Sequence, residues 1–180
     1  MEIFILNSSE MSTSDSYWID KLSLEKHPEG GYYSETYRSV MSLSPDVLPE
    51  GFDGSRSLLT AIYFLLRNDE FSALHRLKSD EMWHFYDGSQ LRVHMIEPGG
   101  RYTWFRLGRE AERGDVLQAV VPAGCWFGAT LEIPDTWVLA GCVVSPGFDF
   151  RDFELATRDE LLRLYPMHRE LIVRLIREES

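Results

Sequence analysis

Short apolar runs alternate with turn residues along most of this chain, and this pattern restricts the fold more than any other feature. Turn signals lie at residues 87–88 (DG), 97–100 (EPGG) and 113–115 (RGD). Many short strands joined by regular turns are typical of a β-sandwich or a closed β-barrel. The pattern therefore predicts an all-β domain whose strands cover about residues 32–40, 57–67, 70–77, 82–86, 90–97, 101–107, 116–121, 125–131 and 136–145.

Both ends of the chain favour helices instead of strands. Residues 14–22 predict a short helix, with Ser14 or one of the two residues before it as the N-cap. Thr157 and Glu160 have the spacing of a capping box, so helices are expected within residues 158–178. No linker or repeat divides the chain, and we expect one domain over residues 15–180 after a flexible segment 1–14, in which Met11 is an alternative start.

Composition and charge limit the partners of the protein. Its 180 residues are 44% hydrophobic, which is typical of a globular protein. The net charge of -11 disfavours DNA, RNA and anionic membranes, because phosphate binding needs clustered Lys and Arg; a single phosphorylated small molecule would need only a local cation. Cys125 and Cys142 lie in apolar runs, which predicts reduced core cysteines. We find no signal peptide and expect a cytoplasmic protein.

The segment 71–88, FSALHRLKSDEMWHFYDG, places a histidine, a glutamate and a glycine at positions 75, 81 and 88. This spacing resembles the first motif of the cupin superfamily, in which Leu77 would be a second histidine. Residues 118–129, QAVVPAGCWFGA, resemble the second motif, with Phe127 at the position of its histidine. The resemblance implies a double-stranded β-helix, the jelly-roll barrel of the cupins. Because two of the four usual ligands are apolar here, no metal or other cofactor is expected; His75 and Glu81 would hold one if present.

Strand periodicity sorts the side chains around the turn at Gly88. If residues 83 and 93 oppose each other in a hairpin, one apolar face is expected to line the barrel, formed by Glu81, Trp83, Phe85, Leu91, Val93 and Met95. A carboxylate among these rings needs a partner or a ligand. His84 and His94 fall on the other face, where an outer surface, a subunit contact or a metal pair would account for them.

Three segments together resemble a narrower group, the small uncharacterised cupin-5 family. They are HPEGGYYSETYRS (27–39), the segment 71–88, and VVPAGCWFGA (120–129) with its continuation PGFDFRDFELATR (146–158). The resemblance covers about residues 17–166. It implies a jelly-roll barrel that is usually paired as a homodimer, without an established activity.

The same segments resemble the metal-independent keto-sugar-nucleotide epimerases, which also have the cupin fold. Residues 31–35 (GYYSE) resemble their first motif, and residues 73–75 (ALH) resemble the strand that carries their basic histidine. Gln118, Pro122, Gly124 and Gly128 resemble the third. This resemblance implies His75 as a base. The late strand 136–145 lacks the tyrosine that serves those enzymes as the acid, so no general acid is assigned.

The candidate site residues follow from these motifs. His75 is a candidate base or a hydrogen-bonded core histidine. Glu81 is expected to orient His75, accept a bond from a substrate hydroxyl, bind a cation, or pair with Arg76 or Lys78. Asp149 and Asp152 are candidate caps of the first C-terminal helix or, less directly, catalytic groups. The expected ligand-binding residues are Tyr33, Glu35, Trp83, Trp126 and Phe127. Tyr33 and Glu35 share a strand face suited to hydroxyl-rich ligands, and the rings of Trp126 and Phe127 suit stacking on a flat base or sugar face.

Three functions remain open on this basis. The first is an aromatic pocket for a small polar molecule (a sugar, nucleotide or nucleobase), with epimerase- or isomerase-type proton transfer by His75. The second is a non-catalytic binder or sensor. The third is a metal-dependent oxygenase or isomerase with a reduced ligand set.

Overall fold

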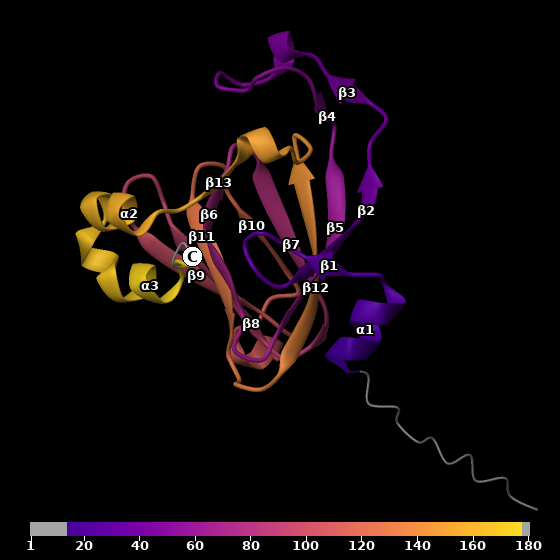
Figure 1. Cartoon of the computed structure of the whole chain (residues 1–180), viewed down its shortest axis with the longest axis vertical. Coiled ribbons are helices and arrows are strands. Elements are labelled where there is room, and N and C mark those ends of the chain that lie inside the picture. Colours follow the sequence, from indigo (N-terminus) through magenta and orange to yellow (C-terminus); the bar gives the residue numbers. More distant parts are fainter. Residues whose placement is uncertain (1–13, 178–180) are drawn as a thin grey trace, which may run out of the picture.

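A computed structural model describes residues 14–177, and two facing β-sheets form its centre (Figure 1). The six-stranded sheet has the order β1 (Glu25–Lys26), β2 (Tyr32–Arg38), β5 (Thr60–Arg67), β12 (Trp137–Ser145), β7 (Asp80–Gly88), β10 (Gln118–Val121). The five-stranded sheet has the order β13 (Phe153–Leu155), β6 (Phe71–Leu77), β11 (Trp126–Leu131), β8 (Leu91–Ile96), β9 (Tyr102–Leu107). Every strand predicted from the sequence is present. The predicted jelly-roll fold is confirmed, with two sheets that do not close into one continuous barrel.

The turn at Gly88 connects the two sheets instead of forming a hairpin, so the predicted pairing of residues 83 and 93 is wrong. Strand β7 pairs with β12 and β10, whereas β8 pairs with β11 and β9. The predicted faces nevertheless hold, because both strands turn their alternate residues toward the interior between the sheets. All six residues of the apolar face are buried: Glu81, Trp83, Phe85, Leu91, Val93 and Met95.

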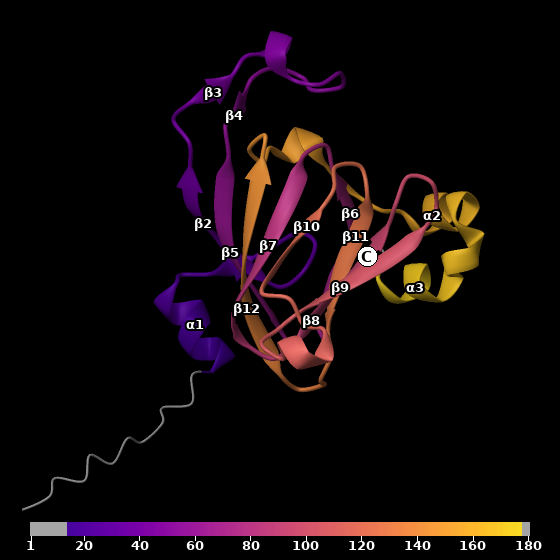
Figure 2. The ribbon, with the colours of Figure 1, turned by 180° about the vertical axis from the view of Figure 1, so that it is seen from behind.

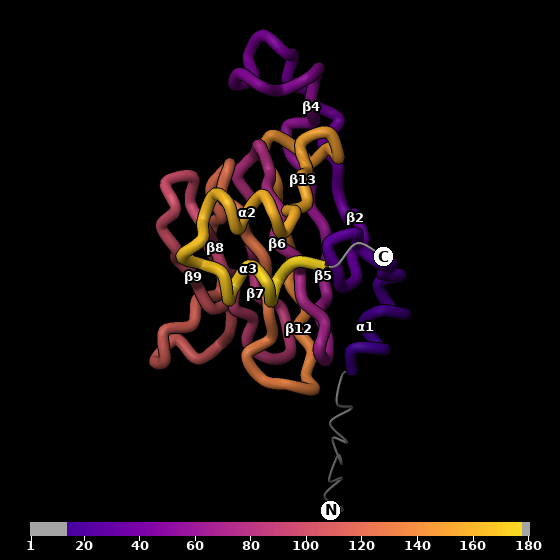
Figure 3. Tube along the Cα trace, turned by 60° about the vertical axis from the view of Figure 1, so that its left-hand side comes forward, coloured from indigo at the N-terminus to yellow at the C-terminus, as the bar shows by residue number. Residues whose placement is uncertain are grey.

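Helices cover the outer faces of both sheets (Figures 2 and 3). Helix α1 (Asp15–Lys21) begins after its N-cap Ser14, whose hydroxyl accepts a bond from the Tyr17 N–H, and it packs near β5 and β12. Helices α2 (Arg158–Leu164) and α3 (Arg169–Arg174), with the 3-10 turns η4 (Pro166–His168) between them, cover the five-stranded sheet. Thr157 is the N-cap of α2, but its side chain makes no capping bond, so the predicted capping box does not form. Within residues 14–177, no helix is long and apolar enough to cross a membrane.

An arm between β2 and β5 projects beyond the sheets (Figure 1). It contains β3 (Ser42–Leu43), η1 (Pro45–Val47) and β4 (Arg56–Ser57). The buried guanidinium of Arg56 donates two bonds to the carboxylate of Asp152, which ties the base of the arm to η3 (Phe150–Asp152). Asp149 caps η3 through the Arg151 N–H. Neither aspartate caps α2, so that expectation is wrong. A further short turn, η2 (Ala111–Arg113), lies between β9 and β10.

Two expectations concern residues outside the described part of the chain. They are the flexible segment 1–14, of which only residue 14 is described, and the alternative start at Met11. The predicted helical region 158–178 is described as far as residue 177.

Candidate functional site

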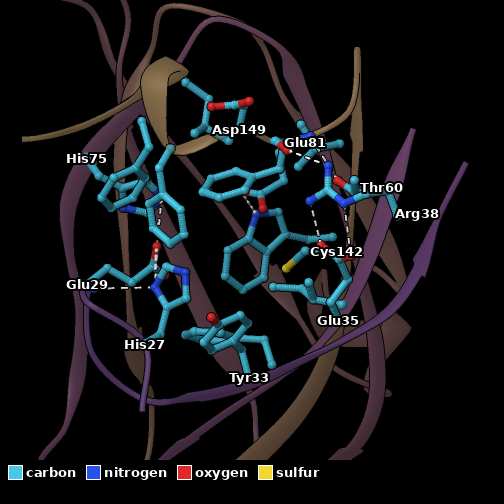
Figure 4. A pocket seen from close by; sticks show the side chains of 18 of the residues that line it. His27, Glu29, Tyr33, Glu35, Arg38, Thr60, His75, Glu81, Cys142 and Asp149 are labelled. Atoms are coloured by element: carbon cyan, nitrogen blue, oxygen red, sulfur yellow. Dashed lines mark hydrogen bonds and ion pairs between the residues drawn. The ribbon is translucent and has the colours of Figure 1, made fainter. Parts of the chain in front are cut away.

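A cavity of about 380 Å³ opens between the six-stranded sheet and strands β6 and β13 (Figure 4). Its walls combine aromatic rings with carboxyl and imidazole groups, and inward-facing alternate residues of five strands supply most of them. The lining residues are Glu25, His27, Glu29, Tyr33, Glu35, Arg38, Thr60, Ile62, Phe64, His75, Leu77, Glu81, Trp83, Cys142, Val144, Phe148, Asp149, Phe150 and Phe153. The size is suited to a molecule such as a monosaccharide or a heterocyclic base.

The loop between β1 and β2 brings Glu29 into the cavity wall. Gly30 follows at a φ of 113°, a conformation that L side chains rarely adopt. A Cβ at this position would lie 2.3 Å from the carbonyl oxygen of Phe71. The close approach of loop and strand lets the Ser72 hydroxyl donate to Glu29 Oε1 at 2.7 Å. The glycine pair in HPEGG is therefore required to place the carboxyl group of Glu29 in the cavity wall.

Glu29 lies between two histidines (Figure 4). Its Oε2 is 3.2 Å from His75 Nε2 and 3.3 Å from His27 Nδ1. The other nitrogen of His75, Nδ1, is 2.7 Å from the carbonyl oxygen of Ala73, so it carries the proton and leaves Nε2 as an acceptor. His27 Nδ1 also acts as an acceptor, from the Glu29 N–H at 3.3 Å. With both imidazoles neutral, the proton of this contact belongs to Glu29.

Burial favours the same proton distribution. Desolvation raises the pKa of Glu29, against the opposing effects of His27, the Ser72 hydroxyl and the Arg177 guanidinium. Desolvation also lowers the pKa of His75 to about 4 and lowers that of His27. A neutral acid donating to a neutral imidazole avoids two buried charges. Movement of that one proton would convert the pair into a carboxylate and an imidazolium.

Glu81 forms the second buried carboxyl of the cavity. The indole Nε1 of Trp83 donates to its Oε2 at 3.0 Å, and the Cys142 thiol also interacts with it. Desolvation, and to a smaller extent the nearby carboxyl group of Glu29, raise the pKa of Glu81 to about 8. The sequence left open a pairing with Arg76 or Lys78, and this interpretation is wrong: Arg76 binds Glu154, while Lys78 donates to the Gly51 carbonyl and lies near Asp152.

The cavity mouth carries ion pairs that are partly exposed. Arg38 forms a two-bond contact with Glu35, at 3.0 and 2.6 Å, and also donates to the carbonyl oxygen of Phe148. Asp149 pairs with Arg151, which lowers its pKa strongly. Figure 4 shows Glu35, Arg38 and Thr60 on the wall opposite to His27, Glu29 and His75.

Five of the seven predicted site residues line this one cavity: Tyr33, Glu35, His75, Glu81 and Trp83. Phe127 is buried beneath it, with its ring centroid 4.0 Å from that of His75. Trp126 does not line the cavity, because the next residue along a strand faces the opposite side. Its ring packs under the C-terminal helices with Leu161 and Ile172. The interpretation of Trp126 as a pocket ring is therefore corrected.

Sequence reasoning missed several lining residues, above all Glu29 and His27. Both belong to the HPEGG segment, which had been recognised only as a family motif. The signal available was a histidine and a glutamate beside two glycines, directly before a strand with predicted site residues. Arg38, Cys142 and Phe148 were missed because nothing in their local sequence separates them from ordinary strand or loop residues.

The donor atoms here do not fit the metal site of typical cupins. Leu77 and Phe127 occupy two ligand positions, and both nitrogens of His75 already have partners. In the described part of the chain, no group of three or more His, Cys, Asp or Glu residues could hold a metal ion. A pair of His84 and His94 is also ruled out by their positions, because these residues lie on different sheets.

Comparisons with known proteins agree with this architecture. The family model Cupin_5, described as "Cupin superfamily (DUF985)", matches residues 16–156. The chain is 32% identical over 156 residues to "Uncharacterized protein YML079W" of Saccharomyces cerevisiae, covering 81% of this chain and 77% of the yeast protein.

Two solved structures are also similar. The crystal structure of protein SO0799 from Shewanella oneidensis has 43% identity and a TM-score of 0.83, covering 93% of this chain and 99% of that one. A hypothetical protein from Leishmania major has 38% identity and a TM-score of 0.84, covering 92% and 100%. None of these names states an activity. The chain belongs to the DUF985 family of the cupin superfamily.

Proposed function

We propose that the protein binds a small polar molecule in this cavity and transfers a proton on it, at a carbon next to a carbonyl group. The observation that carries the proposal is the Glu29–His75 pair. A carboxyl and an imidazole, both almost fully buried, meet at 3.2 Å on a cavity wall. Buried titratable groups that face a cavity are candidates for acid–base chemistry.

In this mechanism Glu29 touches the ligand and His75 is a positioning residue. This differs from the role expected from the sequence, since both nitrogens of His75 have partners within the protein. His75 takes the proton of Glu29, and the resulting carboxylate removes the proton from the ligand carbon. The pair then holds two protons and one positive charge, and the electron pair of the broken C–H bond forms an enolate. Return of the proton from Glu29 to a neighbouring carbon completes an isomerisation, and protonation of the other face, by water or after the enolate turns in the cavity, completes an epimerisation.

The remaining walls position the ligand. Glu81 offers a carboxyl group to a hydrogen-bonding group of the ligand, and its bond from Trp83 holds that carboxyl in place. The rings of Tyr33, Trp83 and Phe148 supply flat apolar surface for a sugar or heterocycle.

Binding without catalysis is the second candidate function. It is favoured by the absence of a free imidazole nitrogen on His75, which leaves proton transfer dependent on one carboxyl group. Under this alternative, His75→Ala weakens ligand binding by about ten- to hundred-fold through the loss of a hydrogen-bonded partner.

Native mass spectrometry of the untagged protein, followed by exchange in D₂O, tests the proposal. Any co-purified molecule and a panel of keto sugars, with and without an amino group, are incubated with the protein, and deuterium at carbon is measured by mass. We expect wild type to introduce one deuterium, and Glu29→Gln to slow this by at least about 100-fold. His94→Gln, a buried histidine outside the cavity, is the matched control and should retain the exchange. Tight binding without deuterium uptake by wild type would leave only the binding function.

A further inference from the structure

The charges around the cavity restrict its ligand. Five carboxyl groups line it, from Glu25, Glu29, Glu35, Glu81 and Asp149. Among the described lining residues, Arg38 is the only Lys or Arg; Glu35 accepts bonds from its Nε and Nη2, and the Phe148 carbonyl accepts from its Nη1. An anionic ligand would therefore meet carboxyl groups without a free cation, at a cost that grows as water is excluded.

The two deepest carboxyl groups have no cationic partner in the described chain. Glu29 contacts only neutral imidazoles and a hydroxyl through its side chain, and Glu81 contacts an indole N–H and a thiol. Arg177 donates to the main-chain oxygen of Glu29, and its charge lowers the pKa of Glu29 without an ion pair to the carboxyl group in the described chain. A buried carboxyl group without an ion-pair partner is suited to a ligand that brings the positive charge itself.

Aromatic rings complete the same environment. Tyr33, Phe64 and Trp83 surround the inner part of the cavity, and Phe148, Phe150 and Phe153 form a cluster of edge-to-face rings toward the mouth. Ring faces attract organic cations through their quadrupole, and more strongly where water is excluded. Carboxyl groups combined with ring faces are the two surfaces that bind ammonium, amidinium and guanidinium groups.

The geometry points to a ligand that carries a protonated nitrogen, anchored by Glu81 between the aromatic walls of the cavity. This inference rests on the proposed function only in using the same cavity, and it names the class of the ligand. It excludes nucleotides and sugar phosphates, which the net charge of the chain had left open. Binding of the cation ionises Glu81, and the released proton leaves to the buffer.

Three flat probes of nearly equal shape test which ligand charge the cavity prefers: benzamidine, benzamide and benzoate, with charges of +1, 0 and -1. Isothermal titration calorimetry at pH 7, in two buffers of different ionisation enthalpy, gives the affinity and the number of protons released. We expect benzamidine to bind at least about tenfold more tightly than benzamide, with proton release, and benzoate not to bind.

Two variants assign the effect to the cavity. Glu81→Gln keeps an acceptor for Trp83, so it should fold normally, weaken benzamidine at least about tenfold, end its proton release and leave benzamide unchanged. Glu154→Gln removes an exposed carboxylate outside the cavity and should behave like wild type. Thermal unfolding of each variant confirms that it is folded.

Three results would overturn the inference. They are equal binding of benzamidine and benzamide, tightest binding of benzoate, or no binding of benzamidine up to about 10 mM. This outcome can be distinguished from failure of the proposed function. An uncharged co-purified molecule that exchanges deuterium would contradict the inference of a cationic ligand and would still support proton transfer.

Discussion

Two buried histidines on the strands that flank β11 show how similar burial can serve different ends. His75 on β6 and His94 on β8 are 2% and 4% exposed, and desolvation lowers the pKa of each to about 4. His75 faces the interior and meets a carboxyl group on a cavity wall. His94 faces outward beneath the C-terminal helices, where the Tyr102 hydroxyl and the Thr130 hydroxyl bind its two nitrogens at 2.8 and 3.0 Å.

The difference lies in what surrounds each imidazole. His94 is enclosed by hydroxyl partners and has two arginines nearby, Arg92 and Arg174, that further oppose its protonation. His75 shares a proton with Glu29 beside open space for a ligand. A lowered pKa and deep burial are therefore common to a packing histidine and a candidate site histidine, and only the cavity and the carboxyl group distinguish them.

The largest expected effect separates their structural roles. His94→Ala should lower the free energy of unfolding by about 4 kcal/mol, because it opens a void and leaves two buried hydroxyls without their partner. Urea denaturation measures this loss. Ligand binding by the folded fraction should not change. A loss of benzamidine affinity in this variant would show that the surroundings of His94 are coupled to the cavity at His75.

The fall in folding stability at acid pH tests the same contrast between His94 and the cavity. The pKa of His94 is about 4 when folded and about 6.5 when unfolded, so between these values the unfolded chain holds a proton on His94 that the folded chain lacks, and the contribution of His94 to stability falls as the pH drops from 6.5 to 4. His94 should account for up to about 3 kcal/mol of this loss. His94→Gln should remove that share of the loss. An acid limb as steep in the variant as in wild type, measured by denaturation at several pH values, would show that His94 does not titrate this way.

The fall in folding stability at higher pH depends on the cavity instead. The pKa of Glu81 is raised to about 8, so the folded chain holds a proton that the unfolded chain has lost, and stability should fall by about 2 kcal/mol as the pH rises from 6.5 to 8. Glu81→Gln should remove the share of Glu81 in this fall, leaving that of Glu29, whose pKa burial also raises. Glu154→Gln is the control that should keep the full limb. A limb unchanged in Glu81→Gln would mean that Glu81 is already ionised.

The smallest effect is expected at Trp126. Its indole Nε1 is buried without a hydrogen-bond partner among residues 14–177, so Trp126→Phe loses no hydrogen bond and keeps much of the apolar contact. We expect the unfolding free energy to fall by about 1 kcal/mol, because the smaller ring leaves part of a fully buried site unfilled, and ligand affinity not to change. A ligand affinity reduced by more than about threefold would return Trp126 to the site.

Much of the fold could be predicted from local pattern. The strand runs, the turn glycines and the alternation around Gly88 depend on neighbouring residues, and the structure contains every predicted strand. The pairing across Gly88 failed because a two-residue turn predicts a hairpin locally, whereas each of the strands finds its partners among distant ones.

The site was predictable only in part for the same reason. Tyr33, Glu35, His75, Glu81 and Trp83 were named from motifs and strand faces, which are properties of single segments. Glu29 and His75 are in contact although they are 46 positions apart in the sequence, and no local spacing rule predicts a contact over that separation. Trp126 and Phe127 are neighbours in one motif, and only the arrangement of the sheets decides which of them faces the interior.

The sequence by itself therefore determined the family, the strands and the apolar identity of two positions that are ligands in other cupins. Those properties depend on residue type and short-range spacing, which the chain carries whether or not it is folded. Tertiary structure alone decided the proton partner of His75, the isolation of Glu81 from the cations of residues 14–177, and the enclosure of His94. These depend on which distant segments exclude water together, because burial and the distance between charges set the pKa of each group.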